Sequence, residues 1–135
     1  MTEDLIRRYF AAFNAQDVDG MLACLSDDIV HDVSQGAQRV GKPAFAAFLA
    51  HMNRCYRETL SNIVVMTEPS GQRAAAEFNL DGAYLATDEG LPEANGQTYQ
   101  LRVGTFFEFS DGHITRVSTH YNLADWTRQV VRAAA

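Results

Sequence analysis

The hydrophobic pattern of this chain changes its period once, and that change restricts the possible folds more than any other feature. Before residue 57, apolar side chains recur at helical spacing, as in Leu5, Ile6, Tyr9, Phe10 and Phe13. From residue 59 to 122 the period shifts towards two, with one face formed by Tyr99, Leu101, Val103, Thr105, Phe107 and Phe109. The first pattern is typical of amphipathic helices and the second of half-buried strands.

Three helices are expected before the four long strands of the sheet. The first covers 3–14, and the second covers 18–25 with Asp17 as its N-cap. A short strand at 29–33 follows, and Pro43 then suits the first turn of the third helix. The apolar face of this third helix comprises Phe45, Phe48, Leu49, Met52 and Tyr56.

Four longer strands are expected at 60–68, 74–87, 98–109 and 114–122, joined as consecutive hairpins. The Asp-Gly pair in the turn at 110–113 is the strongest local signal, because this pair suits a tight hairpin. A last helix should cover 123–132. The polar loop 88–97 is expected to be mobile and to expose Glu93.

These elements predict a single α+β domain over residues 1–135, in which the N-terminal helices cover one face of a curved antiparallel sheet. Three helices cannot fill a strongly curved sheet along its whole length. A pocket between the sheet and the helices is therefore expected.

Composition restricts the partners and the compartment. The net charge of −6 and the absence of a basic run argue against nucleic acid. No apolar run of about 18 residues, the length of a membrane span, occurs. Cys24 and Cys55 are too few for a disulfide framework, so we expect buried, reduced thiols in a cytoplasmic protein. The N-terminus lacks the pattern of a secretory signal.

The stretch 27–41 contains the main candidate for chemistry. Asp32 lies near the end of the short strand, between the apolar Val30 and Val33 and before turn residues. This position suits a general base in a cavity, but it equally suits an aspartate that caps a turn. Tyr9 lies on the apolar face of the first helix, where an amphipathic core tyrosine is the simpler interpretation.

The segment RRYFAAFNAQDVDGMLACLSDDIVHD, residues 7–32, resembles the opening of ketosteroid isomerases and their SnoaL-like relatives. These families belong to the nuclear transport factor 2-like superfamily, and the chain looks most similar to ketosteroid isomerase-related proteins. The resemblance implies a cone-shaped α+β fold with the helices on the concave face of the sheet. The order of elements matches over nearly the whole chain.

The resemblance also implies roles for particular residues. Asp32 matches the base of the family, and Tyr9 matches its main oxyanion donor. Burial in the pocket would raise the pKa of Asp32, which makes a carboxylate a better base near neutral pH. Thr105 stands at the position of the family's second acid, and Val33 stands where the family has proline. These two departures put steroid isomerisation itself in doubt.

The family register also predicts which side chains line the cone. On the last strand it places Val117, Thr119 and Tyr121 inward and His120 outward, while His31 is out of phase with Asp32. The expected binding residues are Phe13, Phe48, Met52, Tyr84, Val103, Thr105, Phe107, Thr119 and Tyr121. No two histidines and an acid share a metal-ligand spacing, so no metal and no cofactor are expected.

Three functions fit these residues. The first is an isomerase or lyase that uses an Asp32 base on a small, mostly apolar carbonyl compound, by isomerisation, cyclisation or dehydration. The second is a ligand-binding protein without chemistry, and the third is a dimeric assembly module. The resemblance implies a homodimer through the outer sheet face, which carries Arg102, Phe106, Arg116 and His120.

Overall fold

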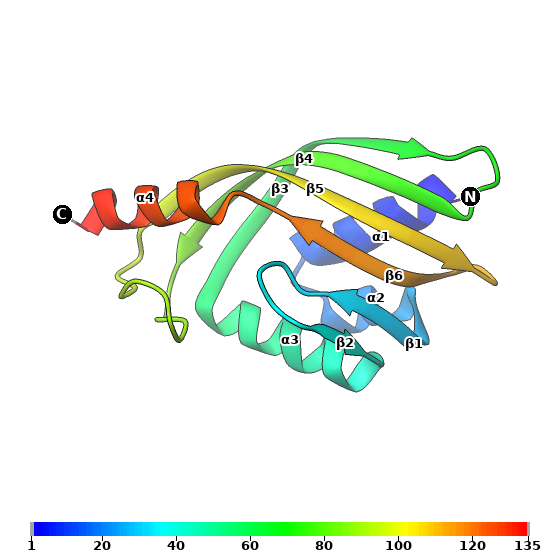
Figure 1. The fold of residues 1–135 in the computed structure, drawn as a ribbon, viewed down its shortest axis with the longest axis horizontal. Coiled ribbons are helices and arrows are strands. Elements are labelled where there is room, and N and C mark those ends of the chain that lie inside the picture. Colours follow the sequence, from blue (N-terminus) through cyan, green and yellow to red (C-terminus); the bar gives the residue numbers. More distant parts are fainter. Residues whose placement is uncertain (1, 135) are drawn as a thin grey trace.

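The computed structural model describes residues 2–134, and within them the helices precede most of the sheet, as expected. Figure 1 shows the order of the elements. The helices are α1 (Thr2–Asn14), α2 (Val18–Ala23), α3 (Lys42–Cys55) and α4 (Leu123–Ala134). The strands are β1 (Leu25–Asp32), β2 (Gln38–Val40), β3 (Tyr56–Thr67), β4 (Arg73–Tyr84), β5 (Thr98–Ser110) and β6 (His113–His120).

The six strands form one curved, unclosed sheet in the order β2-β1-β6-β5-β4-β3. The four long strands pair as consecutive antiparallel hairpins, which confirms the expected arrangement. The pairing of β1 with β6 is parallel, and β1 with β2 is antiparallel. A parallel pair of strands requires a long connection, and here the segment between β1 and β6 contains β2, α3, β3, β4 and β5. The sheet is therefore antiparallel with one parallel pair.

The hairpin between β5 and β6 turns on the predicted Asp-Gly pair. Asp111 has φ of 53° and Gly112 has φ of 75°, so both central residues occupy the left-handed region. A two-residue turn with positive φ at both positions matches the twist of the flanking strands. Local turn chemistry therefore fixes the register of the two strands.

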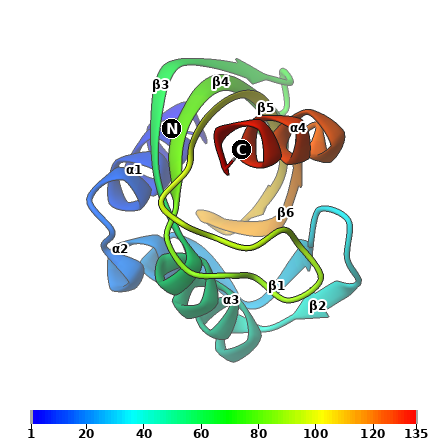
Figure 2. The ribbon, with the colours of Figure 1, turned by 90° about the vertical axis from the view of Figure 1, so that its left-hand side faces the viewer.

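The helices cover the concave face of the sheet. In Figure 2 the sheet curls from β3 round to β1 and β2, and α1, α2 and α3 lie across the open side. The helix α1 buries Leu5, Ile6, Tyr9 and Phe10. At one end of the sheet α4 packs Trp126 against Tyr56, Tyr84 and Tyr99. A second aromatic cluster, of Tyr9, Phe10, Phe78 and Phe107, lies between α1 and the strands β4 and β5.

Several boundaries differ from the expected ones. The second helix ends at Ala23, and β1 begins at Leu25 because Leu25 pairs with Ile114 of β6. Tyr56 starts β3 opposite Tyr84 and is not part of a helix face. The strand β2 was not expected, since its three residues are all exposed and have no apolar pattern. In each case a tertiary pairing overrides the local periodicity.

The loop between β4 and β5 is exposed but tied to the body of the protein. Glu93 is exposed, as expected. The Asp88 backbone N–H donates to the Tyr84 hydroxyl, and Gln97 Nε2 donates to the Glu93 carbonyl. The mobility of this loop stays a prediction.

Cys24 and Cys55 are buried free thiols. The helices of the described chain are all too short or too polar to span a bilayer.

Candidate functional site

A small pocket opens between the N-terminal helices and the start of β3. Its volume is about 50 Å³. It is lined by Phe13, Gln16, Val18, Met21, Phe48, Leu49, Met52, Asn53, Tyr56 and Glu58. Three of the expected binding residues, Phe13, Phe48 and Met52, are therefore brought together here. The lining is mostly apolar, and Glu58 provides its one carboxyl group.

Glu58 faces the concave side of the sheet because of its register. It lies opposite Gly82 of β4, and Gly82 lies opposite Tyr99 of β5, so the three share one face. The Tyr99 hydroxyl donates a hydrogen bond of 2.5 Å to Glu58 Oε2. Burial raises the pKa of Glu58, and the bond from Tyr99 partly offsets this rise. Glu58 lies in β3 and is a site residue that the sequence analysis did not predict.

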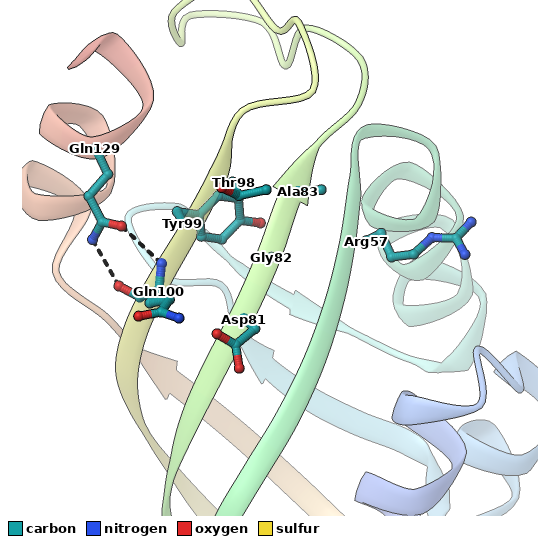
Figure 3. A pocket seen from close by; sticks show the side chains of 8 residues that line it. All are labelled: Arg57, Asp81, Gly82, Ala83, Thr98, Tyr99, Gln100 and Gln129. Carbon is teal, nitrogen blue, oxygen red and sulfur yellow. Dashed lines mark hydrogen bonds between the residues drawn. The ribbon is translucent and has the colours of Figure 1, made fainter. Parts of the chain in front are cut away.

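Tyr99 reaches Glu58 across a glycine. A Cβ atom added at Gly82 would lie 2.3 Å from Cζ of Tyr99, so only glycine admits the ring there. Figure 3 shows the ring over this part of β4. Gln129 makes two hydrogen bonds, of 2.8 and 2.9 Å, with the backbone of Gln100. The side chain of Gln129 thus occupies the free edge of β5 and fixes α4 on the sheet.

A larger hollow, of about 510 Å³, lies over the ends of β3, β4 and β5, and Figure 3 shows the side chains that line it. It is open to solvent, and its lining residues are Arg57, Asp81, Gly82, Ala83, Thr98, Tyr99, Gln100 and Gln129. Ligand sites for apolar molecules enclose most of the ligand surface. This open, polar hollow does not provide such an enclosure, and we place the candidate site in the smaller, apolar pocket.

Tyr9 lies deeper in the fold than the pocket. Only 6% of its surface is exposed, and its ring packs against Phe10 and edge-on against Phe107 at 6.0 Å. Burial raises the pKa of its hydroxyl. Tyr9 is not among the residues that line the pocket of about 50 Å³. The core interpretation therefore describes its surroundings better than a shared site with Asp32.

The other expected binding residues do not line this pocket. Thr105 and Thr119 face each other across β5 and β6, with their hydroxyl oxygens 3.2 Å apart. Val103 and Phe107 are buried in the core. Tyr84 is completely buried, stacks on Tyr56 and donates to the Pro92 carbonyl at 2.6 Å. Burial and the nearby Glu58 charge raise the pKa of Tyr121.

The expected position of Asp32 is wrong. Asp32 lies opposite Ser118, which lies opposite the exposed Phe106, so the carboxylate faces the outer side of the sheet. Its acceptor atoms are occupied by Ser118 Oγ, by Gln38 Nε2 at 2.9 Å and by Arg116 at 3.1 Å. These donors, Ser118 first, lower the pKa of Asp32 to about 2. The expected rise in pKa and the shared pocket with Tyr9 are both corrected; the catalytic role of Asp32 stays a prediction that this geometry does not support.

His31 takes the inward position that was assigned to its neighbour. His31 lies opposite the buried Val117 and is 5% exposed. The centroid of its ring lies 4.7 Å from the ring centroid of Phe45 and 4.6 Å from that of Phe48. Its Nδ1 atom is buried and has no hydrogen-bond partner. Burial lowers the pKa of His31 to about 4, so the ring is neutral near pH 7. The alternation of residues along the strand does not by itself show whether His31 or Asp32 points inward.

Three potential metal ligands meet at the end of α3. The ligand atoms of His51, Cys55 and Asp88 lie within 4.8 Å of one another. Arg54 lies 3.0 Å from His51 Nδ1, and His51 Nε2 lies 2.8 Å from Asp88. Because arginine only donates, Nδ1 accepts and Nε2 carries the hydrogen. This tautomer does not suit a metal at Nε2, and Asp88 also accepts a bond of 2.7 Å from Tyr56.

Comparisons with known proteins give a consistent family. The model of the SnoaL-like domain matches residues 6–117. The chain is similar to a candidate polyketide cyclase from Silicibacter sp. TM1040, with 59% identity over 96% of this chain and 94% of that one and a TM-score of 0.94. A candidate polyketide cyclase from Pseudomonas putida KT2440 has 55% identity, with 96% and 98% coverage and a TM-score of 0.95.

A more distant structure supports the fold alone. An NTF2-like protein from Burkholderia pseudomallei K96243 has 18% identity, covers 96% of both chains and has a TM-score of 0.80. Among curated proteins, none matches this chain.

Proposed function

Because this chain belongs to the SnoaL-like domain family, we propose that it binds a small, mostly apolar carbonyl compound between the N-terminal helices and the sheet. One observation carries this proposal: the pocket behind Phe13, Phe48 and Met52 is apolar, with the carboxyl group of Glu58 in its wall. An apolar enclosure with few polar groups is the usual form of a small-molecule site. The candidate polyketide cyclases among the similar structures point to the same class of compound.

The proposed chemistry is proton transfer next to the carbonyl group. Isomerisation, aldol-type cyclisation and dehydration each need a base near the acidic carbon and a hydrogen-bond donor near the carbonyl oxygen. Amino-acid side chains supply both roles, so the proposed reaction needs no cofactor. Gln16 and Asn53 provide amide N–H groups in the lining.

The pocket has to widen when a ligand binds. Its volume of about 50 Å³ is well below the roughly 300–1,000 Å³ that drug-sized ligands occupy. Met21 and Met52 are part of the lining, and methionine side chains change conformation easily. Movement of these side chains would enlarge the pocket without moving the sheet.

Binding without chemistry is the alternative, and one observation favours it. The position that matches the second acid of the related isomerases is Thr105, whose hydroxyl already pairs with Thr119. A threonine hydroxyl is a far weaker acid than a carboxyl group, so it stabilises an oxyanion less.

Met52→Trp is expected to abolish ligand binding, because the larger side chain fills the pocket. We would measure the rise in Tm caused by a panel of apolar ketones and β-keto esters, together with exchange of their α-hydrogens in D2O by NMR. Val131→Trp is the matched control, since Val131 is 52% exposed on α4 and outside the pocket lining. Equal binding by wild type and Met52→Trp would contradict the proposed site.

We further propose that the protein is a homodimer through the outer sheet face. A row of facing residues there runs through Met66, Ala75 and Phe106, with Met66 52% and Phe106 49% exposed. Charged groups that include Arg116 and Asp32 border this apolar row, which is the usual arrangement of an interface. Phe106→Glu is expected to give monomers at micromolar concentration by light scattering, and a monomeric wild type would contradict the proposal.

A further inference from the structure

We infer that Glu58 is the residue that takes and returns the proton in the pocket, and that Tyr99 positions its carboxyl group. This inference rests on the proposed function and replaces Asp32 as the base. Glu58 belongs to the pocket lining, whereas Asp32 faces the opposite side of the sheet. A base has to reach the proton that it removes, so position comes before acidity in this assignment.

The two oxygens of Glu58 have different surroundings. Oε2 accepts the 2.5 Å hydrogen bond from the buried Tyr99 hydroxyl. No protein group in residues 2–134 donates to Oε1, and this atom is not among the buried side-chain atoms without a partner. One oxygen therefore anchors the carboxyl group, and the other is free to meet a ligand. Buried tyrosine hydroxyls usually have such a partner, so the contact restrains both side chains.

The anchor itself is rigid. Tyr99 is 2% exposed, its ring packs edge-on against Trp126 at 5.8 Å, and it passes directly over Gly82. A carboxyl group held by a fixed donor loses little entropy when a substrate arrives, which favours a precise approach to a C–H bond.

The surroundings suit a base that works near neutral pH. Burial among apolar side chains raises the pKa of Glu58. Tyr56 shares the pocket with Glu58, Tyr99 donates to it, and Tyr121 feels its charge. Burial raises the pKa of each of these phenols, so all three remain neutral. Asp88 is a further acid near Tyr56 and Tyr121, but its oxygens are engaged by Tyr56 and His51. No cation among the described residues pairs with Glu58.

The step balances without any co-reactant. The Glu58 carboxylate removes a hydrogen from the carbon next to the carbonyl, so a C–H bond breaks and an O–H bond forms on Glu58. The electron pair of the C–H bond moves into the enolate, whose charge lies on the carbonyl oxygen. Glu58 then returns the proton to the same carbon, or to the far carbon of a conjugated enolate, and is regenerated.

The test is the exchange of ketone α-hydrogens in D2O, followed by NMR for the intact protein and its variants. Glu58→Gln is expected to slow exchange by roughly 10²–10⁴-fold, the usual contribution of a positioned base, while the ligand-induced rise in Tm remains. Glu77→Gln is the matched control, because Glu77 is an exposed strand glutamate on the outer face. Glu58→Asp should also lose rate, since the shorter side chain retracts the carboxylate from the ligand.

Tyr99→Phe tests the positioning role by a readout other than stability. Loss of its hydrogen bond removes a contact that lowers the pKa of Glu58. The carboxyl ¹³C resonance of Glu58 should then titrate at higher pH, and the acid limb of the exchange–pH profile should move in the same direction. An unchanged titration would overturn the role of Tyr99.

The remaining outcomes separate this inference from the proposed function. Exchange that survives Glu58→Gln but is lost in Asp32→Asn would overturn Glu58 and support the assignment from the sequence. Ketones that bind to wild type without any exchange would overturn the proton-transfer role and leave a binding protein. Neither binding nor exchange with any compound of the panel would overturn both proposals.

Discussion

Gly82→Ala is expected to lower the free energy of unfolding by about 2–3 kcal/mol, at the upper end for added volume in a packed core. The new Cβ would lie 2.3 Å from Cζ and 2.5 Å from the hydroxyl oxygen of Tyr99. The Tyr99 ring cannot move aside freely, because it is buried against Trp126 and bonded to Glu58. Urea unfolding should give a lower midpoint with an unchanged m-value.

Gly104→Ala is the matched control for this change. Gly104 is also a strand glycine, but the nearest atom to its added Cβ is the Ala76 carbonyl oxygen at 4.0 Å. Its stability should stay within about 0.5 kcal/mol of wild type, as for surface substitutions that break no contact. Equal losses at Gly82 and Gly104 would show that strand flexibility, not the ring of Tyr99, determines the effect.

The buried histidine is expected to make the fold sensitive to mild acid. The pKa of His31 is about 4 in the folded protein, against an ordinary value of 6.5 for a solvated histidine, so between these values the unfolded chain binds more protons. Stability therefore falls as the pH falls through this window. Between pH 6.5 and pH 4, protonation of His31 in the unfolded chain lowers the free energy of unfolding by about 3 kcal/mol, because each pKa unit corresponds to roughly 1.4 kcal/mol.

His31→Phe removes this titration and the unpaired Nδ1 atom. The variant should be as stable as wild type at pH 7, or more stable by about 1 kcal/mol, since a buried unpaired polar atom is lost. The advantage of the variant should grow as the pH falls from 7 to 4.5, in urea titrations at each pH.

The control for the acid effect is His113→Phe. His113 is exposed at the start of β6, so its replacement removes a histidine without touching the surroundings of His31. A parallel pH dependence of wild type and His31→Phe would contradict the assignment to His31.

The class of fold and many of its elements follow from local patterns in the sequence. Alternation along 74–87 and 98–109 fixed which side chains share a face, because successive strand residues point to opposite sides. The Asp111-Gly112 turn fixed one hairpin, because positive φ at both positions matches the strand twist. The resemblance to SnoaL-like proteins, carried mainly by residues 7–32, is confirmed by the family match.

The face of each strand that meets the core depends on contacts between segments far apart in the chain. His31 and Asp32 alternate on the same strand, and their sides follow from the pairing of β1 with β6, which lies far along the chain. Glu58 enters the pocket because β3 begins at Tyr56 and places Glu58 opposite Gly82. A local pattern specifies that neighbours point to opposite sides, but long-range register decides which side is buried, and a shift of one residue exchanges the two.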